Sequence, residues 1–242
     1  MKSKILLIVE GEDTEPTILG NATHGLLSLI GADYEIVPFK NPIYELYEAY
    51  KEGEYDDIVA FLRANKNLKI NDNILSKNAF SAIYLIFDFE PHYHKYSDDI
   101  IRDLLQTFDN ETELGKLYIN YPMVESYYHL QELPDDKYND RTVTLEGFNG
   151  KNYKKLVNTT TCLKKNFITE ENLCYIIYHN YMKSKTITAC DEIRYDLILE
   201  NQIKKKNEER KVFVLCTFPL LTVDYNQEYT LEKIQSNIHQ TL

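Results

Sequence analysis

The sequence predicts an α/β protein with a parallel-sheet core and a largely helical insertion. Short apolar runs alternate with amphipathic segments over residues 4–119. Such alternation is typical of a parallel sheet whose faces are covered by helices. From about 150 to 208 the apolar spacing is helical and the segment is rich in lysine, and an apolar run returns at 211–216. We therefore expect a helical region placed between the early strands and one late strand of the same sheet.

The chain opens with a strand, a helix and a second strand. Residues 4–9, KILLIV, form a short continuous apolar run, which is typical of a buried strand. Pro16 suits the first turn of a helix, so a helix is expected over about 16–30. Residues 34–39, YEIVPF, read as the second strand, and their proline indicates a sheet edge.

Two helices and a third strand follow. Apolar side chains recur at i, i+3, i+4 and i+7 over 43–50 and again over 55–62, which predicts two amphipathic helices. A polar linker at 64–79 leads to the apolar run AIYLIF at 82–87, the third strand. Ser97 is then expected to cap the next helix.

The fourth strand is expected at 116–119, and Pro122 is expected to open another helix. The run KVFVLC at 211–216 predicts a late strand that returns to the main sheet. The predicted organisation is a core over 1–125, a helical insertion or accessory region over 126–208, and a C-terminal segment over 209–242 that completes the core.

Composition restricts the class of protein. The chain has 242 residues, 43% hydrophobic and 27% charged, as expected for a soluble globular protein. No apolar run approaches the ~18 residues that a membrane helix needs, and no secretory signal is recognisable. No two of the four cysteines form a CxxC pair, which argues against a zinc ribbon or a disulfide framework. We therefore expect a cytoplasmic protein that does not contact a membrane.

The net charge of −11 is divided unevenly along the chain. Residues 1–140 sum to −14, whereas residues 141–242 sum to +3. No acid lies between Glu146 and Glu170, but this stretch contains five lysines that could contact a nucleic-acid backbone or a partner protein: Lys151, Lys154, Lys155, Lys164 and Lys165. A solvated helix face is the structural alternative for these lysines.

Acidic residues follow the predicted strands. Glu10 comes after the first strand and Glu15 follows it at the start of the first helix. Asp88 and Glu90 come after the third strand, and Glu125 follows the fourth. Taken singly, each acid could be a solvated turn residue or a helix-start acid. If the first and third strands are neighbours, however, the carboxylates converge and repel unless a cation binds among them. Oxygen ligands favour Mg²⁺ or Mn²⁺ and therefore phosphoryl chemistry.

Several other carboxylate-bearing folds lack their motifs here. A haloacid-dehalogenase phosphatase needs Asp-x-Asp after the first strand, where this chain has Glu10-Gly11. A receiver domain needs a lysine after its last strand, but Cys216 is followed by Thr-Phe-Pro. The Rossmann dinucleotide motif needs three glycines, and VEGEDTEP has one.

The segments LLIVEGEDTEP and YLIFDFE resemble the TOPRIM domain of topoisomerases, primases, OLD-type nucleases and RloB-like proteins. The RloB-like start Glu-Gly-x-x-Thr-Glu-Pro is matched by Glu10, Gly11, Thr14, Glu15 and Pro16. An Asn-Pro-x-x-Glu segment is matched in part by Asn120, Pro122 and Glu125, with Tyr121 intervening. The TOPRIM Asp-x-Asp is Asp88-x-Glu90 here. The resemblance covers about residues 1–130 and 211–224.

The resemblance implies a TOPRIM-like, Rossmann-like core and a metal-dependent nuclease acting on DNA or RNA. It implies that Glu10 and Asp88 are catalytic, and that the ligands of Mg²⁺ or Mn²⁺ are Glu10, Asp88, Glu90, Glu15 and Glu125. It also implies a role in bacterial antiphage defence beside an ABC-type ATPase. The alternative is a catalytically silent TOPRIM-fold subunit whose work is to dock on that ATPase.

Overall fold

A computed structural model describes residues 4–20, 25–53, 55, 57–64 and 80–238. The chain divides into two compact units. Unit 1 comprises Met1–Thr17 and Gly31–Tyr118, and unit 2 comprises Ile18–Ile30 and Ile119–Leu242. The segment 209–242, which the sequence suggested would complete the first core, therefore groups with the helical region.

Unit 1 is built on a mostly parallel five-stranded sheet with the order β2-β1-β3-β5-β4. Its strands are β1 (Lys4–Val9), β2 (Asp33–Pro38), β3 (Ala82–Asp88), β4 (Asp109–Asn110) and β5 (Gly115–Asn120), the last of which runs on into unit 2. β1 pairs in parallel with both β2 and β3. The short β4, which the sequence did not predict, pairs antiparallel with β5 at the sheet edge.

The strand pattern follows from hydrophobicity. Residues 5–9 of β1 and all of β3 are buried, as continuous apolar runs in a covered parallel sheet should be. β2 begins with exposed Asp33 and Tyr34, and it is an edge strand, as its Pro38 predicted. The expectation that the first and third strands are neighbours is confirmed.

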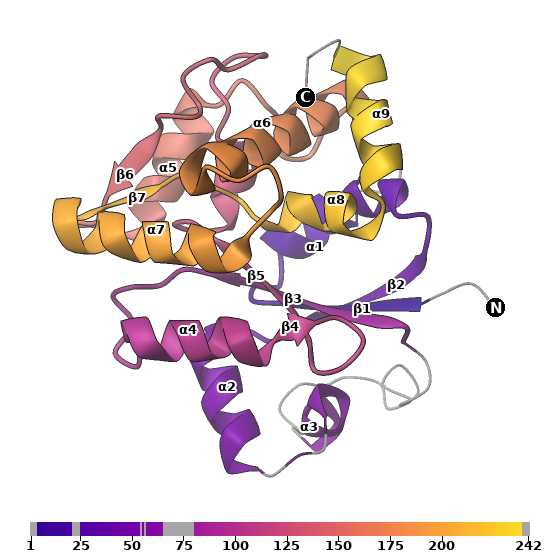
Figure 1. The fold of residues 1–242 in the computed structure, drawn as a ribbon, viewed down its shortest axis with the longest axis vertical. Coiled ribbons are helices and arrows are strands. Elements are labelled where there is room, and N and C mark those ends of the chain that lie inside the picture. The colour runs from indigo at the N-terminus through magenta and orange to yellow at the C-terminus, as the bar shows by residue number, and fades with distance from the viewer. Residues whose placement is uncertain (1–3, 21–24, 54, 56, 65–79, 239–242) are drawn as a thin grey trace. The chain divides into compact units, whose positions relative to one another are not determined.

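The helices of unit 1 include α2 (Ile43–Glu52), α3 (Ile58–Ala64) and α4 (Asp98–Thr107). All three lie on the same side of the sheet in Figure 1. The predicted cap of α4 is confirmed, because Ser97 Oγ accepts a hydrogen bond of 3.1 Å from the Ile100 amide. Most of the predicted polar linker at 64–79 lies outside the described residues.

The prediction of one helix over 16–30 is wrong in both bounds. α1 spans Thr14–Leu19, and its first helical hydrogen bond joins the Thr17 amide to the Asp13 carbonyl. Pro16 therefore sits in the first turn, where its missing amide breaks no helical bond. Gly20 follows directly and disfavours continuation of the helix. A separate 3₁₀ helix, η1 (Leu26–Leu29), comes later.

Unit 2 is mainly helical, as the periodicity after residue 150 predicted. Its elements are η2 (Val124–Tyr128), β6 (Thr142–Thr144), α5 (Gly150–Thr160), α6 (Glu170–Thr188), α7 (Tyr195–Glu209), β7 (Lys211–Phe213), η3 (Phe218–Leu220), α8 (Leu221–Tyr225) and α9 (Gln227–Ile238). The long helix α6 packs against α7, α9 and η3. The helix expected at Pro122 is the five-residue 3₁₀ helix η2.

The prediction that 211–216 is a strand of the main sheet is wrong. β7 pairs antiparallel with β6 in a separate two-stranded sheet. Beyond β7, Leu215 makes one isolated antiparallel bridge with Tyr121. The apolar run correctly indicated burial, since Val212, Val214 and Leu215 are fully buried. Hydrophobicity does not specify which strand supplies the hydrogen bonds, so the pairing partner was not predictable from it.

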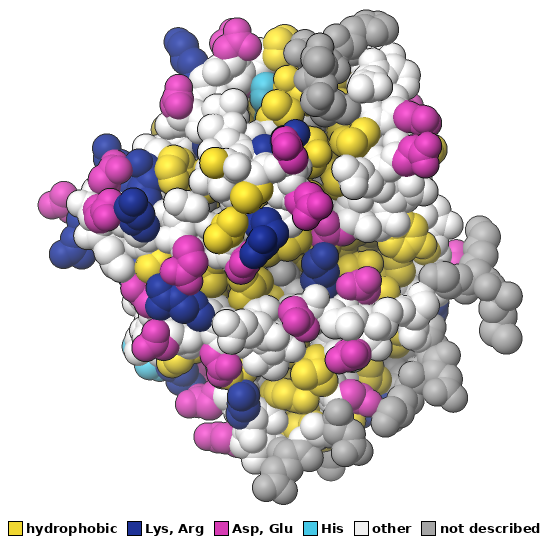
Figure 2. Space-filling view, in the orientation of Figure 1, with side chains coloured by type: hydrophobic (Ala, Val, Ile, Leu, Met, Phe, Trp, Pro, Cys, Tyr) yellow, Lys and Arg dark blue, Asp and Glu magenta, His cyan; other side chains and the backbone are white. Residues whose placement is uncertain are grey.

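The surface is mixed in charge. On the face drawn in Figure 2, acidic and basic side chains are interspersed, although the chain carries a net −11. Across the ranges that the structure describes, no helix has both the length and the hydrophobicity required to cross a membrane.

Candidate functional site

The first candidate site lies in unit 1, where β1 and β3 end side by side. Glu10 directly follows β1, and its amide donates a hydrogen bond of 3.1 Å to the Ile86 carbonyl of β3. Its side chain turns toward the end of β3, because Glu10 Oε2 accepts a hydrogen bond of 3.1 Å from the amide of Asp88. The end of β3 therefore fixes the carboxylate of Glu10.

Glu15 is held against the same loop. Its Oε1 accepts a hydrogen bond of 3.0 Å from the Gly11 amide, and the residue is only 3% exposed. A Cβ at position 11 would lie 2.6 Å from Glu15 Oε2, far inside van der Waals contact. The Glu-Gly pair of the sequence is thus explained: Gly11 lets the loop pass close to the Glu15 carboxylate.

Glu90 sits in the loop after β3, and α2 anchors that loop. The Tyr93 amide donates to the Glu90 carbonyl at 3.0 Å, and the Tyr93 hydroxyl hydrogen-bonds Glu45 of α2. Lys95 Nζ donates to Glu45 Oε2 at 2.8 Å. These contacts fix the loop that follows Glu90. Its Oε2 is nevertheless buried without a hydrogen-bond partner.

The carboxylates of Glu90 and Glu15 repel the carboxylate of Glu10, and Asp88 lies beside them. The pKa of Glu10 is raised to about 8, first by burial and then by the charge of Glu90, while the hydrogen bond from the Asp88 amide opposes the rise. Glu15 adds to the repulsion. Burial also raises the pKa of Glu90. A cation among these carboxylates would relieve the repulsion and supply the partner that Glu90 Oε2 lacks. We call Glu10, Glu15, Asp88 and Glu90 the carboxylate cluster.

The donor set suits a hard divalent cation, because every group is a carboxylate oxygen. Asp88 is 6% exposed and ends a strand in the sheet centre, so its backbone is rigidly placed. As the side chains stand, the described part of the chain contains no group of three or more His, Cys, Asp or Glu arranged as a metal site.

Glu125, the fifth predicted ligand, belongs to unit 2. It lies in η2, is fully buried, and neither carboxylate oxygen has a hydrogen-bond partner. Lys154 Nζ of α5 comes within 3.0 Å of Glu125 Oε1, an ion-pair distance without hydrogen-bond geometry. Its participation with the carboxylate cluster stays a prediction.

The five predicted lysines lie on α5 and in the turn that follows it. Lys151, Lys154, Lys155 and Lys164 are exposed, and Lys165 is half-buried. Lys154 differs from the others because its side chain reaches back to Glu125. The remaining lysines are placed as a surface contact would require, although a solvated helix face has the same exposure.

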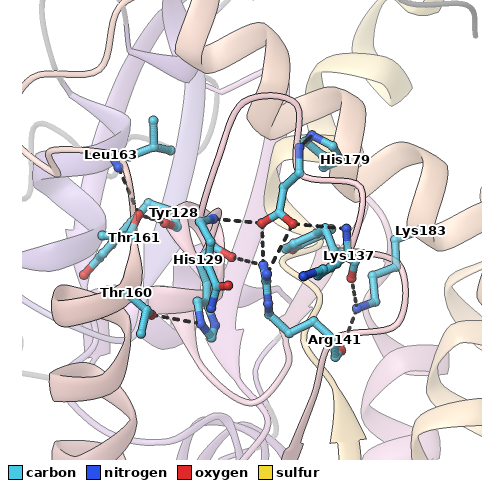
Figure 3. Close-up of polar contacts among 12 residues, drawn as sticks. Tyr128, His129, Lys137, Arg141, Thr160, Thr161, Leu163, His179 and Lys183 are labelled. Carbon is cyan, nitrogen blue, oxygen red and sulfur yellow. Dashed lines mark hydrogen bonds and ion pairs between the residues drawn. The ribbon is translucent and has the colours of Figure 1, made fainter.

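The sequence did not predict a second cluster of buried polar groups, which lies in unit 2 (Figure 3). At its centre, the Arg141 guanidinium donates to both carboxylate oxygens of Asp135, at 2.8 and 3.2 Å. Arg141 also donates to the His129 carbonyl at 2.7 Å. The Asp135 carboxylate accepts further bonds from the amides of Gln131 and Lys137.

Two helix α6 side chains extend this cluster. His179 Nε2 accepts a 3.0 Å hydrogen bond from the Asp135 amide. Lys183 is fully buried, and its ammonium donates to the carbonyls of Tyr138 and Arg141 at 2.6 and 2.7 Å. We call Asp135, Arg141, His179 and Lys183, together with His129, the buried ion network.

The pKa values of the network reflect pairing at Asp135 and burial at the histidines and the lysine. Burial opposes ionisation of Asp135, but the hydrogen bonds from Arg141 and Gln131 outweigh it and hold its pKa below the ordinary value. Burial lowers the pKa of His129 and of His179 to about 4. Burial, followed by the Arg141 charge, holds the pKa of Lys183 well below its ordinary value.

One signal in the sequence marks this network. Helix α6 is buried almost all round, and His179 and Lys183 interrupt its apolar residues at a spacing of i, i+4. Polar side chains at that spacing lie on one face of a helix. Their partners Asp135 and Arg141 are more than 40 residues away, so no local pattern indicated the pairing.

Comparison with known proteins does not identify the site, so we judge the site on its geometry. No protein-family profile, curated protein or solved structure matches the chain. The structure brings Glu10, Glu15, Asp88 and Glu90 together at one edge of the sheet in unit 1. It places Glu125 and the lysines in unit 2.

Proposed function

We propose that the chain is a metal-dependent nuclease of the TOPRIM type. The carboxylate cluster supports this proposal most directly. Four acids meet at the carboxyl ends of adjacent parallel strands, Glu15 and Asp88 among them nine-tenths buried or more, with a buried oxygen of Glu90 left without a partner. The carboxyl ends of such strands are where open α/β sheets bind ligands.

The proposed reaction is hydrolysis of a phosphodiester. Asp88, Glu90 and Glu15 would hold Mg²⁺ or Mn²⁺, with Glu10 beside them. When bound, the cation would polarise the phosphate and lower the pKa of a nearby water molecule. Glu10 would accept the proton as water oxygen bonds to phosphorus and the bond to the leaving oxygen breaks.

The wider context is part of the same proposal. The resemblance to RloB-like and OLD-type proteins suggests a defence nuclease that works beside an ABC-type ATPase. A substrate of DNA or RNA suits the exposed lysines of α5 and the following turn. The silent docking subunit is the competing function, and joint measurement of metal binding and cleavage separates the two.

The test measures metal binding and cleavage in the same variants. Mn²⁺ binding is followed by calorimetry, and cleavage of labelled single-stranded DNA, duplex DNA and RNA is followed in Mg²⁺ or Mn²⁺. Glu10→Gln and Asp88→Asn keep the size of each side chain but remove its charge. We expect each to weaken Mn²⁺ binding about tenfold or more and to lower cleavage by a factor of at least ~10².

Glu12→Gln is the matched control, because Glu12 is an exposed glutamate in the same loop. This variant should bind Mn²⁺ and cleave as the wild type does. Wild-type activity with bound metal in both Glu10→Gln and Asp88→Asn would show that other groups carry the reaction. Metal binding without cleavage, alone or with the ATPase partner, would favour the docking subunit.

A further inference from the structure

An aromatic side chain projects from the turn between α5 and α6. Phe167 is 72% exposed, more than any other large apolar side chain in the part of the chain that the structure describes. The turn itself is ordered by an antiparallel bridge, in which the Phe167 amide donates to the Lys164 carbonyl at 2.8 Å. Leu163 and Ile168 are buried on either side of it. The fold therefore anchors the turn and leaves the phenyl ring in water.

The segment of the chain that contains Phe167 is rich in lysine. Lys164 is exposed within the same turn, and Lys151 and Lys155 are exposed on α5, which precedes it. No acid occurs from residue 147 to 169. Exposing a phenyl ring gives up the free energy that its burial would provide. An exposed ring in an acid-free, lysine-rich segment therefore points to a ligand that has both a flat apolar face and negative charge.

We propose that Phe167 and the surrounding lysines bind single-stranded nucleic acid. The phenyl ring stacks on an unpaired base, while Lys164, Lys151 and Lys155 contact phosphates along the strand. This inference rests on the proposed nuclease function in one respect: it names single-stranded nucleic acid as the class of substrate. Binding itself is independent of the carboxylate cluster.

Two observations favour a single strand over other partners. Stacking requires a free base face, and base faces in a duplex are covered by their neighbours. The cores of protein–protein interfaces are poor in lysine, whereas this segment has three exposed lysines and one exposed phenyl ring. A membrane surface would need a broad apolar face. The exposed residues of α5 are mainly lysine, asparagine and threonine, with Leu156 as its one exposed large apolar side chain.

The absence of tryptophan from the sequence permits a direct test. Phe167→Trp would contain a single tryptophan, whose fluorescence is quenched when it stacks on a base. We expect dT₁₅ or U₁₅ to quench it in EDTA, with the two oligonucleotides separating DNA from RNA preference. Tyr229→Trp is the matched control, since Tyr229 is an exposed aromatic residue on α9, and its fluorescence should not change.

Two further variants separate stacking from charge. Phe167→Ala should weaken binding by about 5- to 100-fold and leave the salt dependence unchanged, because no phosphate contact is lost. Lys164→Gln should make the dependence of log K on log salt shallower by about 0.7, the value for one single-strand phosphate contact. Both sites are exposed, so the free energy of unfolding should stay near that of the wild type.

The inference is overturned if Phe167→Ala binds dT₁₅ and U₁₅ as the wild type does. Equal or tighter binding of a 15-base-pair duplex, or of anionic phosphatidylserine vesicles, by the same surface would overturn it too. The wild-type chain keeps the two proposals distinguishable. If it binds the single strand but neither binds Mn²⁺ nor cleaves, the nuclease is rejected and this inference stands.

Discussion

The carboxylate cluster and the buried ion network handle buried charge in opposite ways. In the carboxylate cluster of unit 1, like charges face one another, the pKa of Glu10 is raised to about 8, and one oxygen of Glu90 has no partner. In the buried ion network of unit 2, Asp135 accepts two bonds from Arg141 and two from backbone amides. Lys183 is likewise satisfied by two carbonyls.

This difference separates the proposed binding site from a structural network. A network whose members are paired within the protein gains nothing from a ligand, and its loss disrupts packing. A cluster of repelling carboxylates is unfavourable until a cation binds, and the proposed metal site rests on this property. Variants in the two units test this contrast, and they are given in order of decreasing effect.

The largest effect is expected at Arg141. Arg141→Met would leave the buried Asp135 carboxylate without its cation and the His129 carbonyl without its donor. We expect the free energy of unfolding to fall by about 3–5 kcal/mol, measured by urea denaturation. Arg194→Met is the matched control, since Arg194 also binds an aspartate, Asp196, through two nitrogens but is half exposed.

The free energy of unfolding of Arg194→Met should fall by no more than about 1 kcal/mol. If the free energy of unfolding falls equally in the two variants, burial of the Arg141–Asp135 pair adds nothing to stability. The interpretation of the buried ion network as structural would then be wrong.

The second prediction concerns pH in the metal-free protein. Between pH 4.5 and about 8, folded chains keep a proton on Glu10 that unfolded chains release, so stability falls as pH rises. We expect the free energy of unfolding to fall across that range by up to about 1.4 kcal/mol per pH unit. In unit 2, His129 and His179 have pKa values of about 4 when folded, so they remove stability as pH falls below their ordinary value of 6.5.

Denaturation in EDTA from pH 5 to 8.5 checks both signs. Glu10→Gln should be more stable than the wild type at pH 8. Above pH 6.5 its free energy of unfolding should decline less steeply than that of the wild type. Saturating Mg²⁺ should remove that decline in the wild type and leave Glu10→Gln unaffected. A decline of equal slope in Glu10→Gln would show that another group causes it.

The smallest effect is expected at Gly11. A methyl group there would collide with the Glu15 carboxylate and break its hydrogen bond to the Gly11 amide, at a cost of about 1–2 kcal/mol. Gly150→Ala is the control, because the nearest atoms to its new Cβ, in Met123, lie at an ordinary 3.5 Å. Thermal unfolding should show Gly11→Ala melting below the wild type and Gly150→Ala at or above it. The reverse order would contradict the close approach of Glu15.

Local patterns explain what could be predicted from the sequence. The runs KILLIV and AIYLIF predicted β1 and β3, because a strand covered on both faces needs continuous apolar residues. Ser97 indicated the start of α4, because the side chain of an N-cap residue accepts a hydrogen bond from an amide three residues further along the chain. The carboxylate cluster could be predicted for the same reason, because its acids follow those strands within a few residues.

The errors share a different cause. The first helix was drawn too long because apolar periodicity continues past Gly20, whereas the helix ends at Leu19. The late strand was assigned to the main sheet because a hydrophobic run predicts burial and not a pairing partner. The actual partner of β7, β6, lies about 70 residues earlier in the sequence.

The sequence by itself determined the α/β class, the position of each central strand and the acids that follow them, since these depend on residues close together in the chain. Only the tertiary structure decided that β7 pairs with β6, that Lys154 reaches Glu125, and that Asp135, Arg141, His179 and Lys183 form one buried network. Burying charge is favourable only when distant residues supply its partners. Those partners are chosen by the packing of helices and loops, which residue spacing does not record.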